Sequence, residues 1–207
     1  DLINSVLSSL NSIVANSWNG YYNALYQVNN VISIVEDLPE SDLRNLIIGE
    51  AHYFRAYIYH SLVTRWGGVP IQRVNTMDKP FRDSEEAVWA FIEEELETAL
   101  AFLGTSSSCY YVSRDAALAL KARVMLERGK KTEAAALAEG LIKDGKYKLD
   151  SFDKIFRGKT NTEVIFSFQC LAEESNITIS TLFYTYAHPN HGSYVYRPTN
   201  DVMNMYD

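Results

Sequence analysis

Apolar residues recur every three to four positions along most of the first 145 residues, which is the period of an amphipathic helix. The strongest example is the stretch 49–70, in which Tyr53, Tyr57 and Leu62 form one apolar row. Aromatic residues lie on other sides of the same stretch and few charges interrupt it, so we expect a helix buried on more than one side. A Gly-Gly-Val-Pro sequence closes it, because glycine ends helices readily and proline cannot continue one.

The same pattern, read with capping residues, predicts four further helices. The first runs from near the start to about Glu36, and the helix described above begins near Ser41 or Asp42. The remaining three are one that begins at Asp83-Ser84, one that begins at Ser113 and ends near Arg128, and one that spans Lys131–Lys143.

After Gly145 the pattern changes. Val164, Phe166 and Phe168 alternate with their neighbours, which predicts a strand, whereas residues 175–197 are typical of a loop. The helices on either side of Gly129 resemble a tetratricopeptide unit. We therefore predict a mainly α fold of tetratricopeptide-like helical repeats, with long loops and minor β structure in the last third.

Composition, charge and cysteine spacing argue against several classes of function. The 207 residues carry a net charge of -7, which argues against nucleic-acid binding. No apolar run is long enough to cross a membrane, and no signal peptide is recognisable in this chain. Cys109 and Cys170 have no metal-ligand spacing, and two free thiols are favoured over one disulfide.

Several stretches together resemble the SusD/RagB family. Glu50-Ala51, Phe54-Arg55-Ala56 and Trp66-Gly67-Gly68-Val69-Pro70 resemble its signature helix. The resemblance extends in the same order through WNGYYNALYQVNNVI, the stretch from Tyr111 to Ile142, Asn161–Phe166 and Arg197-Pro198-Thr199. It implies a SusD-like α-α superhelix in one helical lobe over residues 1–207, truncated at both ends relative to a full family member.

The resemblance also implies a function and a place. Members are outer-membrane lipoproteins that capture nutrients, usually glycans, for a TonB-dependent transporter. We therefore expect non-catalytic binding of an oligo- or polysaccharide on the outer face of a Bacteroidota-type outer membrane, and hand-off to a SusC-like transporter. Membrane attachment would be through an N-terminal lipid that this chain lacks. The alternative is a helical-repeat scaffold that binds a peptide or protein.

The charged residues of the helices are predicted to be structural. Glu50 and Arg55 belong to the signature helix and should bond to neighbouring helices, while His52 and His60 should be packed or interfacial. We expect the solvent side of the third helix to carry four glutamates, Glu93, Glu94, Glu95 and Glu97. No opposed carboxylate pair, nucleophile elbow or phosphate loop is recognisable, so we expect no enzyme and no cofactor.

The best ligand candidate is an aromatic loop, because sugars present apolar C–H faces to flat rings and hydroxyls to polar groups. Its candidate ligand residues are Tyr184, Tyr186, His188, Tyr194 and Tyr196. These tyrosines can instead pack the loop onto the helices. Trp18 is a further sugar platform, although its helical spacing favours core burial. His188 and His191 lie three apart but have no third ligand, so we expect no metal.

Overall fold

The computed structural model describes residues 11–106, 108–156, 160–169, 171, 182–189, 191–193, 196 and 198–205. The chain divides into two compact units, Asp1–Ser167 and Phe168–Asp207. The second unit contains α7 (Asn200–Met203). The first contains α1 (Ser12–Glu36), α2 (Asp42–Trp66), α3 (Glu85–Phe102), α4 (Arg114–Glu127), α5 (Lys131–Lys143) and α6 (Phe152–Phe156).

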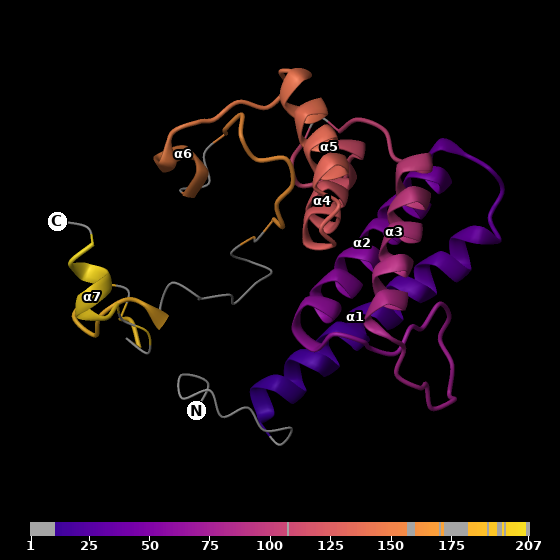
Figure 1. Cartoon of the computed structure of the whole chain (residues 1–207), viewed down its shortest axis with the longest axis horizontal. Helices are drawn as coiled ribbons and strands as arrows, with labels where there is room; N and C mark the ends of the chain where they lie inside the picture. Colours follow the sequence, from indigo (N-terminus) through magenta and orange to yellow (C-terminus); the bar gives the residue numbers. More distant parts are fainter. Residues whose placement is uncertain are drawn as a thin grey trace. The chain divides into compact units, whose positions relative to one another are not determined.

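The helices of the first unit pack in chain order. From α1 to α5, each helix contacts the next one along the chain, and α2 also contacts α4. Figure 1 shows α2 beside α1 and α3, with α4 and α5 forming a further pair. The main fold is therefore helical, as predicted.

Local capping sets the helix boundaries. The hydroxyl oxygens of Ser41, Ser84 and Ser113 accept hydrogen bonds from backbone N–H groups of the first turns of α2, α3 and α4. At the end of α2, Gly67 adopts a φ of 68°, which glycine tolerates without strain. The predicted starts of α2, α3 and α4 and the glycine stop are confirmed, whereas the start predicted for the first helix lies outside the described residues.

The core is centred on α2. Ala56, Tyr59 and Leu62 have no exposed surface, and Tyr59 makes an edge contact with the ring of Phe91 on α3. Buried positions of α2 lie on several sides of the helix, which confirms that it is enclosed by its neighbours. Full burial of one such side chain stabilises a fold by about 1.5–3 kcal/mol.

A buried ionic cluster joins α2 to α3. Glu95 is 2% exposed, and its carboxylate accepts hydrogen bonds from Arg55 at 2.6 and 2.8 Å. His52 Nδ1 lies 2.8 Å from the same carboxylate, and Arg55 also donates to Asn29 Oδ1 on α1. The structural role predicted for Arg55 is confirmed, and His52 is packed as expected.

The prediction that Glu95 faces solvent is wrong. One helical turn separates Glu95 from Phe91 and from Ala99, and both are buried on the α2-facing side. Burying a carboxylate is unfavourable unless partners compensate it, and Arg55 and His52 supply those partners. Glu94 and Glu97 do face solvent, where Arg73 and Lys121 pair with them.

Two other titratable residues of the signature helix also bond to neighbouring parts of the chain, Glu50 to the loop before α4 and His60 to helix α4. Glu50 accepts a hydrogen bond from the Val112 backbone, and burial raises the pKa of its carboxyl. His60 is buried, and its Nε2 lies 2.7 Å from a carboxylate oxygen of Glu127 on α4.

The predicted β structure is also wrong, because the described residues contain no strand. In the segment predicted to be a strand, Phe166 packs onto helix α2, where its ring contacts Tyr53 and Phe54. The backbone of this segment bonds to the loop before α4, where Ser167 N–H donates to the Cys109 carbonyl at 2.9 Å. Burial does not alternate here, because the adjacent Ile165 and Phe166 are both partly buried against the core and Phe168 is 56% exposed. Among the described residues no neighbouring strand is present to form a ladder.

Candidate functional site

The predicted aromatic loop lies in the second unit and is built from tight turns. The backbone N–H groups of His188 and Gly192 both donate to the Thr185 carbonyl, at 3.0 and 3.1 Å. Gly192 is required here, since a Cβ at this position would lie 1.9 Å from the Tyr184 carbonyl oxygen. His191 adopts a φ of 45°, the left-handed region that a few non-glycine residues enter in turns.

Within this loop the structure brings some predicted ligand residues together. The Tyr184 and His188 rings stack with centroids 3.9 Å apart and planes 17° apart, and the Tyr196 ring lies 5.7 Å from that of Phe183. Tyr186 is 74% exposed, so among the described candidate residues its side chain is the most open to a ligand. Tyr194 lies outside the described residues, as does Cys170; Cys109 is a free cysteine.

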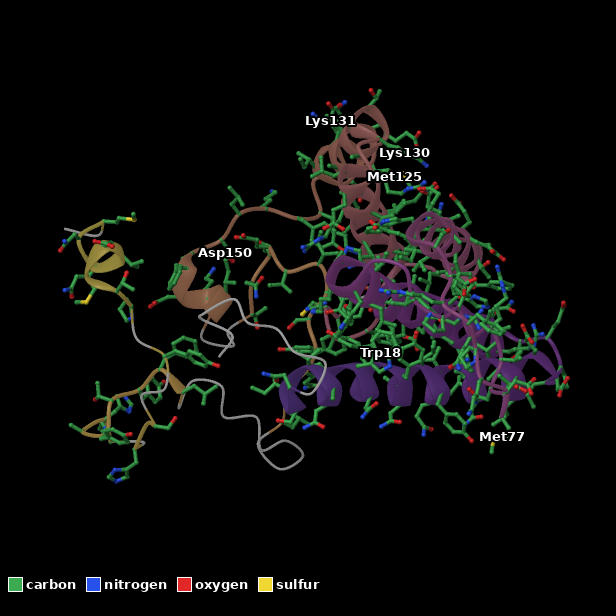
Figure 2. The ribbon with its side chains drawn as sticks, turned by 60° about the horizontal axis from the view of Figure 1, so that its bottom comes forward. Trp18, Met77, Met125, Lys130, Lys131 and Asp150 are labelled. Carbon is green, nitrogen blue, oxygen red and sulfur yellow. The ribbon has the colours of Figure 1, made fainter. Side chains whose placement is uncertain are left out.

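Trp18 lies in the first unit, on α1. Its ring contacts Tyr22 with centroids 4.9 Å apart and meets Trp66 of α2 edge-on at 5.4 Å. Trp18 is partly buried against the core, so packing accounts for its helical spacing. Figure 2 labels Trp18 on the α1 ribbon, facing the other helices of the bundle. Its role in ligand binding stays a prediction.

Sequence reasoning missed a hollow of about 400 Å³ in the first unit. Its walls come from the loop before α4 and from the chain on either side of α6, which runs out and returns toward α4 (Figure 1). Six of the lining residues are Ser108, Cys109, Tyr110, Lys146, Tyr147 and Asn161. Tyr110, Tyr147 and the hydroxyl residues gave a weak signal, because the two segments that contribute them are far apart in the sequence.

One carboxylate fixes the charged side of this hollow. Asp115 Oδ2 accepts hydrogen bonds from Lys146 Nζ at 2.7 Å and from Tyr147 Oη at 2.8 Å. Burial acts to raise the pKa of Asp115, but these two bonds outweigh it and hold the pKa below its usual range. The carboxylate is thus ionised, and its charge balances that of Lys146.

The segment after α6 that lines the hollow, residues 160–165, is held by hydrogen bonds. Lys148 N–H donates to the Thr162 carbonyl at 2.9 Å, and Thr162 Oγ1 donates to the Lys148 carbonyl at 3.1 Å. The Asn161 side-chain oxygen accepts from the backbone N–H groups of Glu163 and Val164. The wall containing Asn161 is therefore pinned in place.

Among the described residues, no three His, Cys, Asp or Glu side chains come together as a metal site would require. In the same residues, none of the helices has the length and apolar character needed to span a membrane.

The fold of the first unit defines a class of mainly helical proteins whose helices pack in chain order, and comparison with known proteins identifies the family. The SusD-like family described as "Starch-binding associating with outer membrane" matches residues 1–126. The chain therefore belongs to the SusD-like family, an outer-membrane-associated family.

Individual relatives agree. A SusD-like protein of Formosa agariphila is 29% identical over 163 residues, which are 76% of this chain and 32% of that protein. The crystal structure of a SusD-like protein from Bacteroides fragilis is 29% identical, with a TM-score of 0.66 over 75% of this chain and 33% of that one. A crystal structure with xylogluco-oligosaccharide shares the fold at 23% identity, with a TM-score of 0.78 over 87% of this chain and 41% of that one.

The chain spans 24% to 32% of the length of the curated relatives that it matches. What a whole SusD-like protein does is therefore a proposal for this chain.

Proposed function

We propose that this protein binds a nutrient glycan at the outer-membrane surface without breaking bonds in it. The observation that carries the proposal is the family match over residues 1–126, to a family described as starch-binding and associated with the outer membrane. A protein with the same fold has been crystallised with xylogluco-oligosaccharide, which supports the same ligand class.

In this proposal the aromatic loop contacts the sugar. Tyr186 offers an open ring face, and the Tyr184–His188 stack beside it in the chain is held by the turn around Thr185. A ring held in place binds a sugar face with little loss of side-chain freedom, which favours affinity. Tyr194 and Tyr196 complete the proposed loop site, and Trp18 is a further proposed contact.

The family match also supports a proposal for the partner and the attachment. We infer hand-off of the glycan to a SusC-like TonB-dependent transporter and attachment to the outer face of the outer membrane through an N-terminal lipid. The helices would act as a tetratricopeptide-like scaffold within one lobe, and loops on such a scaffold often carry recognition.

Isothermal titration of the purified chain against soluble starch, xyloglucan and laminarin oligosaccharides tests the proposal. We expect saturable binding that Tyr186→Ala or Tyr194→Ala weakens by about tenfold, the loss of roughly 1.4 kcal/mol. Tyr111→Ala, which removes a tyrosine that is 66% exposed outside the loop, should leave the affinity unchanged. Equal weakening by the control variant would refute the loop site.

A second candidate function is binding of a peptide or protein. The corner between α1 and α2 favours it, because it exposes Ile34, Leu38 and Leu43 to between 49% and 66%. Exposed apolar groups of this kind mark interaction surfaces when they are contiguous. A glycan array with no positive sugar, together with peptide binding that Leu43→Ser abolishes, would favour this function over glycan binding.

A further inference from the structure

We propose that the hollow lined by Tyr110, Lys146, Tyr147 and Asn161 is a second carbohydrate pocket, which takes one or two neutral sugar rings. The ligand class rests on the proposed function, whereas the position does not. All the lining residues belong to the first unit, and the aromatic loop belongs to the second.

The size of the hollow fits this ligand. Its volume is about 400 Å³, at the lower end of the roughly 300–1,000 Å³ of small-molecule pockets. One or two sugar rings fill such a space, whereas a long polysaccharide does not. The second pocket would therefore bind a chain end or a short oligosaccharide.

The chemistry of the walls fits a neutral polyol. Tyr110 and Tyr147 supply ring surface, while the walls also carry serine, threonine and asparagine groups that hydrogen-bond to hydroxyls. The ammonium of Lys146 is balanced by the Asp115 carboxylate, so the walls have no excess charge to attract an ion. An anionic or cationic ligand would bring a charge that no free counter-charge in these walls balances.

The walls are also held before a ligand arrives. Asp115 fixes Lys146 and Tyr147, and the paired bonds between Lys148 and Thr162 fix the opposite segment. Little ordering is then needed on binding, which favours affinity for a small ligand. Tyr110 is 43% exposed, so its ring is accessible at the mouth of the hollow.

Cys109 allows a direct test, because it is a free thiol in the wall of the hollow. In a Cys170→Ser background, the rate of Cys109 modification by iodoacetamide is measured with and without maltotriose, cellotriose or laminaritriose. At a sugar concentration of about ten times Kd we expect the rate to fall about tenfold. Sorbitol, an open-chain polyol, should not protect the thiol.

Matched variants test whether the protection of Cys109 comes from sugar bound in the hollow. Tyr110→Ala should abolish protection, while Tyr111→Ala, at the neighbouring exposed tyrosine outside the hollow, should retain it. Tyr186→Ala should also retain it. Protection that survives Tyr110→Ala, or saturable sugar binding by titration without any protection of Cys109, would overturn the second pocket and leave the proposed function standing.

A second measurement does not depend on thiol reactivity. Titration of the Tyr186→Ala chain with the same trisaccharides should show residual saturable binding, which adding Tyr110→Ala removes and adding Tyr111→Ala does not. Absence of residual binding overturns the second pocket. Residual binding with no contribution from Tyr186 in the parent chain would instead support the second pocket and contradict the loop site.

Discussion

Arg55 and Glu95 form a two-pronged ion pair across the interface between α2 and α3. Nε of Arg55 lies 2.6 Å from one oxygen of the Glu95 carboxylate, and Nη2 lies 2.8 Å from the other. Both residues are at most 5% exposed. Such a pair fixes how two helices meet, because neither charge can stay buried without the other.

The first prediction concerns removal of one partner. Glu95→Gln leaves the Arg55 guanidinium buried without its counter-charge, which should lower the free energy of unfolding by about 3–5 kcal/mol. Glu94→Gln is the matched control, because the Arg73–Glu94 pair is more than half exposed and should contribute less than about 1 kcal/mol. Urea unfolding followed by circular dichroism measures both. Similar losses for the two variants would contradict the structural role of Glu95.

The second prediction concerns pH. Burial alone would raise the pKa of Glu95, but hydrogen bonds from His52 and Arg55 outweigh it and hold the pKa below its ordinary value of 4.5. A folded-state pKa below the unfolded value adds stability that is present above the unfolded pKa. That contribution is lost as the pH falls through the lower, folded-state value.

The free energy of unfolding should therefore decrease as the pH is lowered from 6 through about 4 and below. Glu95→Gln should flatten this dependence, since it removes the group that titrates, although other shifted carboxyls such as Asp115 remain. Urea midpoints at a series of pH values measure the slope. An unchanged slope in the variant would show that Glu95 does not contribute to it.

The third prediction concerns the turn that ends α2. A Cβ at Gly68 would lie 2.2 Å from the Asp83 carbonyl oxygen, so Gly68→Ala must shift backbone and should destabilise the fold by about 1–3 kcal/mol. Gly20→Ala is the opposite case, because Gly20 lies within α1 with open space around it. That variant should stabilise the protein by roughly 0.5–1 kcal/mol. Thermal unfolding should move in opposite directions for the two alanines.

The fourth prediction concerns a buried hydroxyl. Tyr59 Oη accepts a hydrogen bond from Gln72 N–H at 2.6 Å and donates to the Pro70 carbonyl at 3.3 Å. Tyr59→Phe leaves the Gln72 N–H without this partner, which should lower stability by about 1–3 kcal/mol. Tyr26→Phe, at a tyrosine that is 53% exposed, should change stability by less than about 0.5 kcal/mol. Chemical denaturation compares them, and equal effects would argue against the bond.

Much of the helical fold could be predicted from sequence because its signals are local. Ser41, Ser84 and Ser113 each cap a helix through a hydrogen bond to a residue three positions later, and Gly67 ends α2 by its own backbone conformation. The prediction of a strand around Phe166 is wrong because strand formation is not decided locally. Alternation reports a half-buried segment, but a strand also needs a partner from elsewhere in the chain.

The candidate sites divide in the same way. The aromatic loop is contiguous in sequence, so its tyrosines were recognisable, although their roles as ligand contacts stay predictions. The hollow around Tyr110 was not recognisable, because its walls meet only when residues 106–113 and 146–165 fold against one another.

By itself the sequence determined where α2 to α5 lie and where α1 ends, how α2, α3 and α4 are capped and which family the chain resembles, because capping, periodicity and signature residues act over a few positions. Only the tertiary structure decided that Glu95 is buried and that Tyr110 and Tyr147 share one hollow. The physical reason is that burial and pocket formation depend on partners distant in the chain. Arg55 lies 40 residues from the carboxylate it compensates.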